Sequence, residues 1–563
     1  MEALDWLVIG VFFLALIGII VWVVRQKQND SADYFLGGRD ATWLAIGASI
    51  FASNIGSEHL IGLAGAGASS GMAMAHWEIQ GWMILILGWV FVPFYTRSMV
   101  YTMPEFLERR YNPQSRTILS VISLVSYVLT KVAVTVYAGG LVFQQVFGIK
   151  ELWGIDFFWI AAIGLVVLTA LYTIFGGMKS VLYTSVLQTP ILLLGSLIIL
   201  VLGFKELGGW DEMMRVCGAV TVNDYGDTMT NLIRSNDDAN FPWLGALIGS
   251  AIIGFWYWCT DQFIVQRVLS GKNEMEARRG TIFGAYLKLL PVFLFLIPGM
   301  IAFALHQKYI GAGGEGFLPM LANGTANADA AFPTLVAKLL PAGVKGLVVC
   351  GILAALMSSL ASLFNSSAML FTIDFYKRFR PETPEKKLVG IGQVATVVIV
   401  ILGILWIPIM RSVGDVLYTY LQDVQSVLAP GIAAAFLLGI CWKRTSAQGG
   451  MGLIAGMVIG LTRLGAKVYY SNAGEVADST FKYLFYDMNW LFFCGWMFLF
   501  CIIVVIVVSL ATKAPTAEKI QGLVFGTATK EQKAATRASW NHWDIIHTVI
   551  ILAITGAFYW YFW

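Results

Sequence analysis

The sequence predicts an all-α integral membrane protein of about 14 transmembrane helices, arranged as a 5+5 inverted repeat with additional flanking helices. Three observations predict this fold. The 563 residues are 58% hydrophobic, with a mean hydropathy of +0.73, far above the range of soluble domains. Apolar runs of about 20 residues recur from end to end, each long enough to cross a hydrocarbon core. The second and seventh runs, five places apart in the series, are interrupted by polar residues at corresponding places, Ser53–Ser57 and within Trp256–Gln262, as inverted repeats are.

The apolar runs follow one another along the whole chain. They lie near 5–24, 42–66, 77–96, 117–145, 154–175, 181–203, 243–265, 281–305, 336–376, 388–410, 418–440, 448–470, 489–511 and 543–562. The ninth run is too long for one crossing. Pro341 and Gly343 therefore predict a short interfacial helix before a span that begins near 346.

Lys and Arg set the expected orientation. The first run follows Glu2 and Asp5 rather than basic residues and has no small-residue cleavage pattern, so we expect a retained span. With the N-terminus outside, the inside loops hold 24 Lys and Arg residues and the outside loops hold seven. Both termini are therefore expected outside, in a plasma (inner) membrane. The net charge of +3 reflects this topology and indicates no nucleic-acid partner.

The predicted organisation is a single polytopic domain over 1–563. It divides into an extra N-terminal helix and loop (1–41), a first five-helix repeat (42–203), a second repeat (243–441) and C-terminal helices (442–563). The hydrophilic stretches between spans are too short to form a core of their own. No nucleophile–base pair or metal cluster occurs in a plausible pocket, and the six cysteines are scattered, so we expect no enzyme.

Two polar strings lie inside predicted spans, Ser53–His59 and Ser358–Ser362. Hydrocarbon penalises hydroxyl groups and unpaired carbonyls unless they line a cavity or bind something. A dehydrated cation held by carbonyl and hydroxyl oxygens would account for both strings. On pattern alone, a tight seam of small residues between helices explains the serine string equally simply.

Ionisable residues inside the spans are few, and they are expected to face the protein interior in pairs. They are Glu58, His59, Glu78, Lys131, Asp261 and Lys288. Donors and acceptors of this kind, with amides such as Gln422, suit a neutral polyol whose hydroxyls each donate and accept. A purely structural ion pair between Glu78 and Lys288 is the alternative. Trp77, Trp256, Tyr257 and Trp258 would either stack on the apolar face of a sugar or belong to a membrane-interface belt.

Several segments resemble the sodium/glucose cotransporters of the sodium:solute symporter family, which have the LeuT-like inverted-repeat fold. They are Phe51–His59, Met103–Leu107, Trp256–Arg267, Tyr286–Leu289 and Met357–Asn365. The resemblance covers nearly the whole chain. The Trp256–Arg267 string is its most specific part.

The resemblance implies a role for individual residues. Sodium would be bound by the carbonyls of Ala52, Ile55 and Ala355 and by the hydroxyls of Ser358 and Ser359. Substrate hydroxyls would meet His59, Glu78, Lys288 and Gln422. Tyr257 would form an inner gate tied to Asn54, and Trp77 would replace the outer aromatic cap, with Trp258 beside the gate.

Two departures from the family pattern bear on the number of sodium ions. Ser185 follows Tyr183-Thr184 where members usually have an aspartate, and Ala361 stands where members proposed to bind a second sodium carry a hydroxyl. Both missing oxygens would belong to that second site, so one sodium per substrate is expected.

The expected function is therefore sodium-coupled import of a glucose- or galactose-like hexose by alternating access. A myo-inositol or other polyol symporter is the first alternative. A sugar-binding membrane sensor without transport is an alternative of another class, although the sequence offers no output domain.

Overall fold

The computed structural model describes the chain except residues 27, 57, 322–323, 413–416 and 473–476, and except the side chains of 145, 409–412, 417–423 and 472. Within this part, 12 helical stretches are long and apolar enough to cross a membrane. Two of them, 58–98 and 157–207, are 41 and 51 residues long, about twice the length that one crossing needs. The predicted number of about 14 helices stays a prediction.

The first half of the chain is helical apart from one small hairpin; η denotes short 3₁₀- or π-helical segments. Its elements are α1 (Ala3–Val24), α2 (Ser31–Leu36), η1 (Gly37–Arg39), α3 (Trp43–Asn54), η2 (Glu58–Leu63), α4 (Ala64–Ser70), η3 (Gly71–Met74), α5 (Ala75–Glu78), α6 (Gly81–Ile86), η4 (Leu87–Phe91), α7 (Val92–Ser98), α8 (Met103–Arg110), α9 (Pro113–Ser126), η5 (Tyr127–Val132), α10 (Ala133–Phe147), the antiparallel strands β1 (Glu151–Leu152) and β2 (Ile155–Asp156), α11 (Phe157–Leu207) and α12 (Trp210–Gly218).

The second half is helical in all of its described elements. They are α13 (Trp243–Gly254), η6 (Phe255–Thr260), α14 (Gln262–Leu269), α15 (Glu274–Lys288), η7 (Val292–Leu296), α16 (Ile297–Gly311), η8 (Ala328–Ala330), α17 (Ala331–Leu339), α18 (Val344–Met369), η9 (Leu370–Tyr376), α19 (Lys377–Phe379), α20 (Glu385–Ser412), α21 (Leu417–Cys441), η10 (Ala447–Gly450), α22 (Met451–Asn472), α23 (Thr480–Lys482), η11 (Tyr483–Asp487), α24 (Trp490–Ala511), η12 (Ala517–Lys519), α25 (Lys530–Ala538) and α26 (His542–Tyr561).

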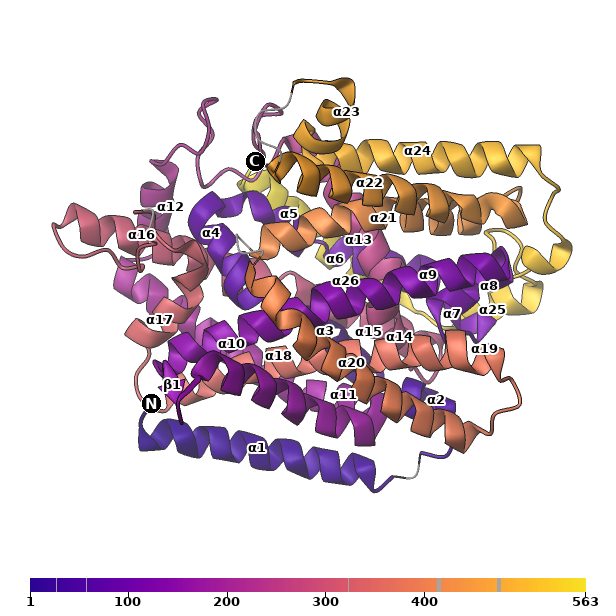
Figure 1. Cartoon of the computed structure of the whole chain (residues 1–563), viewed down its shortest axis with the longest axis horizontal. Helices are drawn as coiled ribbons and strands as arrows, with labels where there is room; N and C mark the ends of the chain where they lie inside the picture. The colour runs from indigo at the N-terminus through magenta and orange to yellow at the C-terminus, as the bar shows by residue number, and fades with distance from the viewer. Residues whose placement is uncertain (27, 57, 322–323, 413–416, 473–476) are drawn as a thin grey trace.

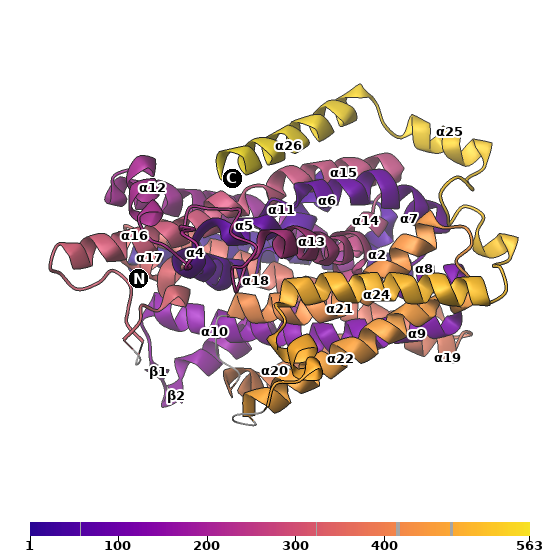
Figure 2. The same cartoon turned by 90° about the horizontal axis from the view of Figure 1, so that it is seen from above.

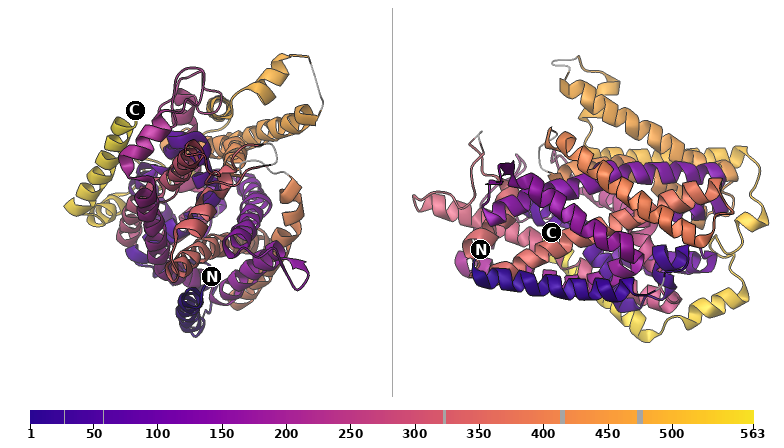
Figure 3. Two further views of the ribbon diagram at one scale, coloured as in Figure 1. Left: turned by 90° about the vertical axis from the view of Figure 1, so that its left-hand side faces the viewer. Right: turned by 60° about the horizontal axis from the view of Figure 1, so that its bottom comes forward.

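Most long helices run along one common direction, horizontal in Figure 1. Both termini lie toward the left-hand end of that view, whereas α8, α19 and α25 lie at the opposite end. Helix α1 follows one edge of the molecule (Figure 1), and α26 lies along another flank (Figure 2). Viewed from one end, the remaining helices surround a central group, with α1 and α26 at the periphery (Figure 3).

Helix α11 reverses direction in its middle. Gly177 has φ +52° and ψ −148°, which is not helical backbone. The Ser180 hydroxyl donates to the carbonyl of Tyr172 at 3.1 Å, eight residues earlier, although eight residues of straight helix would separate them by about 12 Å. A side chain at Gly177 would meet the backbone of Tyr34, so the turn also needs glycine for space. The 51 residues therefore contain two antiparallel segments, as the separate runs 154–175 and 181–203 predict.

The two predicted interruptions are present. Helix α3 ends at Asn54, and Ile55 has extended backbone with φ −83° and ψ 110° before η2 resumes. In the second repeat, η6 ends at Thr260, and Asp261 is extended with φ −77° and ψ 127° before α14 begins. Each interruption leaves the last carbonyls of one helix and the first amides of the next without intrahelical partners. These groups become available at the centre of the molecule.

A close approach of two backbones joins α4 to the η7–α16 segment. A Cβ atom at Gly67 would meet the carbonyl oxygen of Leu296, and one at Gly299 would meet the carbonyl oxygen of Ala64. Both glycines lie inside apolar segments, where small residues permit helices to touch. We call this contact the glycine seam.

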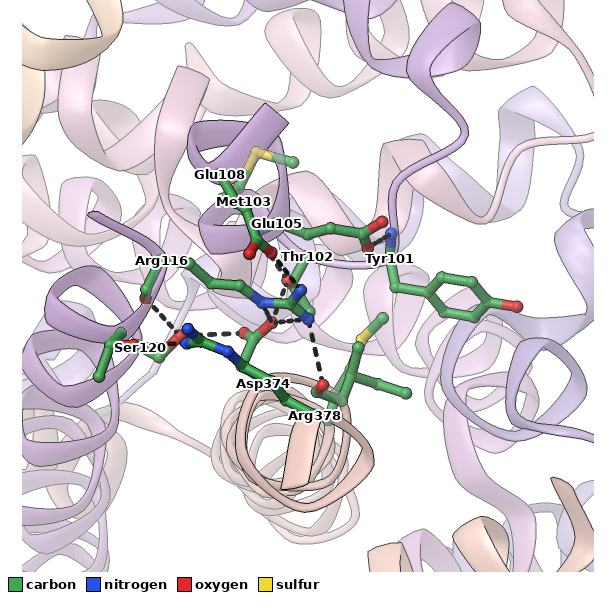
Figure 4. Close-up of polar contacts among 12 residues, drawn as sticks. Tyr101, Thr102, Met103, Glu105, Glu108, Arg116, Ser120, Asp374 and Arg378 are labelled. Carbon is green, nitrogen blue, oxygen red and sulfur yellow. Dashed lines mark hydrogen bonds and ion pairs between the residues drawn. The ribbon is translucent and has the colours of Figure 1, made fainter. Parts of the chain in front are cut away.

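A polar cluster ties α8, α9 and η9 together at the end of the molecule away from the termini. The buried carboxylate of Asp374 lies 2.7 Å from the guanidinium of Arg116 and also accepts from the hydroxyls of Thr102, at 2.8 Å, and Ser120, at 3.1 Å. Arg116 forms a further ion pair with Glu108 at 2.6 Å. Figure 4 shows these side chains converging on Asp374.

Candidate functional site

A small cavity lies between the two interruptions, and most of the predicted site residues line it. Helices α3, α5, α13 and α18 and segments η2, η5 and η6 all contribute to its wall. The predicted residues that border it are Asn54, His59, Trp77, Glu78, Tyr257, Trp258, Lys288 and Ser359. The sequence therefore identified side chains from widely separated segments that meet in one place.

Glu78 is the centre of the polar contacts in the cavity. Its Oε2 atom lies 2.6 Å from the ammonium of Lys288 and 3.4 Å from Nε2 of His59. The amide of Asn54 in turn contacts the same ring nitrogen of His59 at 3.4 Å. All four side chains are buried, so their charges and dipoles interact in a medium of low polarity. The ion pair between Glu78 and Lys288, which the sequence raised as the alternative to substrate binding, is present, and both residues also line the cavity.

Aromatic side chains cover the cavity on two sides. Trp77 is 4% exposed and stacks on Trp490, the first residue of α24, with ring centroids 5.5 Å apart. Tyr257 packs edge to face on Trp258 at 4.9 Å. The indole of Trp258 donates to Gln80 at 3.3 Å. In the described contacts Asn54 bonds to His59, and its expected tie to Tyr257 stays a prediction.

The serine string of α18 lies beside the interruption of α3. The hydroxyls of Ser53 and Ser362 are 2.6 Å apart, which fixes α3 against α18 at this level. Ser359 borders the cavity, and Ser358 lies 3.2 Å from the hydroxyl of Ser185 on α11. Ala52, Ile55 and Ala355 are buried in the same region. Hydroxyl groups from α3, α11 and α18 thus meet beside the interruption of α3.

The two departures from the family pattern are also located. Ser185 donates to the carbonyl of Val181 at 2.6 Å and contacts Ser358, so its hydroxyl is engaged with α11 and α18. Ala361 is fully buried on α18 and presents only a methyl group.

Several lining residues were not assigned to the site from the sequence. They are Glu58, Gln80, Lys131, Val134, Thr135, Ile253, Gly254, Phe263, Leu363 and Gln425. Glu58 and Lys131 were recognisable as rare ionisable residues inside spans, but nothing in the sequence assigned them a partner. The side chain of Gln422 lies outside the described residues, whereas Gln425, one turn further along α21, lines the cavity.

Comparison with known proteins gives consistent results. The sodium:solute symporter family matches residues 34–460. The chain is 36% identical over 542 residues to the sodium/myo-inositol cotransporter 2 of Mus musculus, covering 94% of this chain and 80% of the relative. It is also 36% identical over 551 residues to the sodium/myo-inositol cotransporter of Homo sapiens, covering 93% and 76%.

A solved structure supports the fold. A Na⁺-coupled sialic acid symporter in a substrate-bound outward-open state superposes with a TM-score of 0.72, at 22% identity, over 91% of this chain and 99% of that chain. The LeuT-like fold is therefore confirmed.

Family and fold together define the general activity. The protein is a multi-pass membrane protein that couples solute transport to sodium as the co-transported ion, and it is not an enzyme. The chain belongs to the sodium:solute symporter family.

Proposed function

We propose that the protein imports myo-inositol or a closely related cyclitol together with sodium, by alternating access. The observation that carries this proposal is the 36% identity to sodium/myo-inositol cotransporters over more than nine-tenths of the chain. A glucose- or galactose-like hexose, the substrate first expected from the sequence, is less well supported, because these relatives are named for myo-inositol.

The chemistry of the cavity supports a polyhydroxylated ring. Glu78 accepts, Lys288 donates, and His59 and Asn54 offer both kinds of group. The indole N–H of Trp77 is buried without an acceptor among the described residues, so a substrate hydroxyl would satisfy it. Myo-inositol carries a hydroxyl on every ring carbon and can meet donors and acceptors all round its edge.

Uptake of radiolabelled myo-inositol, glucose and galactose into proteoliposomes, with an inward sodium gradient and with potassium in its place, tests this proposal. We expect sodium-dependent accumulation of myo-inositol that excess unlabelled glucose inhibits only weakly. Accumulation of hexose with no inositol uptake would establish the hexose symporter instead. Binding of either compound without accumulation would support the sensor.

We further propose that the sodium ligands are the carbonyls of Ala52, Ile55 and Ala355 and the hydroxyls of Ser358 and Ser359. Exchanging Ser359 for alanine removes one oxygen, and we expect the sodium concentration for half-maximal uptake to rise roughly tenfold, as for one lost charge-assisted contact of about 1.5 kcal/mol. Ser367→Ala is the matched control, because Ser367 is buried on the same helix about two turns further along. Equal effects of both exchanges would refute the assignment.

The proposed coupling ratio is one sodium per substrate. One charge crossing about 100 mV supplies ~2.3 kcal/mol, and a tenfold sodium gradient adds ~1.4 kcal/mol, which supports about 500-fold accumulation. Simultaneous measurement of charge and labelled inositol should return one charge per inositol, and a value of two would refute the ratio. The double exchange Ser185→Asp with Ala361→Thr restores the two missing oxygens, and we expect the sodium Hill coefficient to rise above one.

The remaining assignments follow from the same proposal. The protein would lie in the plasma (inner) membrane with both termini outside. Residues 42–203 and 243–441 would form the two repeats, with 1–41 and 442–563 flanking them. Cysteine labelling of each terminus from either side of sealed cells tests the orientation.

A further inference from the structure

Lys131 lies at one side of the cavity and bonds to a carboxylate that the substrate contacts do not use. Its ammonium is 2.7 Å from Oδ2 of Asp261, and both side chains are at most one-tenth exposed. The same ammonium lies over the ring of Tyr257, 4.7 Å from the centroid, and over that of Phe263 at 4.8 Å. Aromatic faces and one carboxylate therefore replace water around this charge.

Asp261 connects the segment that carries Tyr257, the proposed inner gate, to α14. It is the extended residue between η6 and α14, and its carboxylate caps α14 by accepting from the amide of Phe263. The hydroxyl of Tyr127 also donates to it, so η5 holds this carboxylate through Tyr127 as well as Lys131. Tyr257 belongs to η6, four residues before Asp261. The contacts of Asp261 with Tyr127 and Lys131 of η5 therefore also restrain Tyr257, which lines the cavity.

A second carboxylate is within electrostatic reach of the same lysine. Glu58 begins η2, directly after the interruption of α3, borders the cavity and interacts electrostatically with Lys131. Glu58 and Asp261 thus occupy similar places, since Asp261 forms the interruption of one broken helix and Glu58 follows the interruption of the other. Lys131 belongs to the continuous α9–η5–α10 segment between them.

We propose that Lys131 is a positioning residue that links the two helix interruptions by exchanging carboxylate partners. Bound to Asp261, it latches α14 and Tyr257 and keeps the cavity closed toward the inside. When α14 moves away, the ammonium shifts to Glu58, so the charge stays paired in both states. An unpaired ammonium at this depth would otherwise oppose the opening. The inference needs the alternating access of the proposed function, but it does not depend on which polyol is carried.

The latch is tested by access to a reporter cysteine rather than by uptake. Val265 is buried in α14, one turn past Asp261 toward the predicted inside. We would measure the rate at which a membrane-impermeant methanethiosulfonate labels Val265→Cys from the inside of the membrane, with sodium present and substrate absent. The labelling rate of the protein without the Val265→Cys substitution is subtracted, because the protein carries native cysteines.

Lys131→Met and Asp261→Asn should each speed labelling about tenfold or more, because each removes one partner of a buried ion pair. Their combination should be no faster than either alone, since both remove the same contact. Lys131→Arg should restore slow labelling. Lys205→Met, at an exposed lysine, is the matched control. Unchanged labelling in folded Lys131→Met or Asp261→Asn protein would overturn the latch; if the first does not fold, the second decides.

Glu58→Gln tests the second half of the exchange. It leaves the Lys131–Asp261 pair intact, so labelling without substrate should stay within about twofold of the parent. Sodium-driven uptake should lose maximal rate roughly tenfold, because the ammonium finds no carboxylate in the open state. An unaltered maximal rate of uptake would show that Lys131 pairs with Asp261 only, and it would overturn the proposed change of partner to Glu58. Absence of inositol uptake in the parent would contradict the proposed substrate alone, because the labelling rates need no substrate.

Discussion

At the scale of single residues, Glu78 organises the cavity. It accepts from Lys288 and lies 3.4 Å from Nε2 of His59 while remaining 1% exposed. A buried carboxylate between two such neighbours is held in one orientation, which would prepare it for the proposed contact with a substrate hydroxyl. The same pair would cost much if broken, because each charge depends on the other for stabilisation.

Glu78→Gln should therefore lower the ratio of maximal uptake to half-saturating inositol concentration by roughly 10- to 100-fold, mainly through weaker binding. The amide keeps the shape of the side chain but leaves the Lys288 ammonium without its counter-ion. Concentration-dependent uptake at saturating sodium measures the change. Glu382→Gln, at an exposed glutamate, is the control. Equal affinity in both variants would show that Glu78 serves only the structure.

Asp329 should make the stability of the folded protein depend on pH. Burial raises the pKa of this carboxyl from 3.8 to about 6, and its Oδ1 atom has no partner among the described residues. Because the folded protein then binds the proton more tightly than the unfolded chain, stability falls as the pH rises from about 4 to about 6. Asp329→Asn should raise Tm at pH 8 and not at pH 4, with Asp237→Asn unchanged at both. A constant difference between pH 4 and 8 would contradict the shifted pKa.

Sequence reasoning found residues whose chemistry is unusual for their surroundings. His59, Glu78 and Lys288 are rare inside spans, so their meeting could be predicted. Glu58 and Lys131 carried the same signal, but which carboxylate meets which cation depends on how distant helices pack, and the sequence does not contain that directly. Gln80 and Gln425 gave weaker signals, because a lone amide in an apolar run equally often bonds to a neighbouring backbone.

At the scale of elements, the Asp374 cluster joins three segments that no apolar contact alone would align. Asp374 on η9 meets Arg116 of α9, and Arg116 meets Glu108 of α8 (Figure 4). The carboxylate of Asp374 is fully buried, so its pairing with Arg116 has little competition from water. The cluster therefore fixes α8 against α9 and η9.

Asp374→Asn should lower Tm of the purified protein by roughly 5 °C, because the guanidinium of Arg116 loses the more deeply buried of its two carboxylate partners. Thermal unfolding followed by intrinsic fluorescence measures this. Glu212→Gln removes the partner of Arg215 in an exposed pair and should leave Tm unchanged. A decrease no larger than that of the control would show that Arg116 finds other acceptors at no cost.

The elements themselves were predictable to different degrees. Long apolar runs identified the spans, and the polar strings at Ser53–His59 and Thr260–Gln262 located both interruptions. The reversal inside α11 was predicted as two runs, although hydropathy could not locate it at Gly177. The π-helical segments η2, η5 and η6 left no sequence signal, because an extra residue in a helical turn depends on packing around it.

At the scale of the whole molecule, the C-terminal helix α26 contacts residues from the first half of the chain. The hydroxyl of Tyr559 lies 2.9 Å from Nδ1 of His76, and the other nitrogen of that ring contacts the carbonyl of Leu232 at 3.1 Å. The amide of Leu232 donates to the carbonyl of Phe562 at 3.0 Å. Helix α26 thereby supports the 219–242 loop beside Trp77, although hydropathy presents it only as one more span.

His76→Phe should therefore speed amide hydrogen exchange across 219–242 about tenfold, as expected from losing one or two buried hydrogen bonds. Mass spectrometry of the folded protein measures this exchange. His542→Phe, at the exposed start of α26, should leave the loop as it is. Equal exchange in both variants would place the support of the loop elsewhere.

The glycine seam has a thermodynamic consequence. Segment η2, which carries His59, continues into α4, and Lys288 ends α15 just before η7, so the seam joins the two segments that hold these proposed substrate contacts. Backbones in direct contact leave no room to slide, so His59 and Lys288 would keep their spacing in any motion that moves the seam. The intrinsic dissociation constant for the polyol at these contacts should then be equal at the two faces of the membrane. Uphill accumulation would then be driven by the sodium gradient and the membrane potential, with no contribution from a difference in substrate affinity.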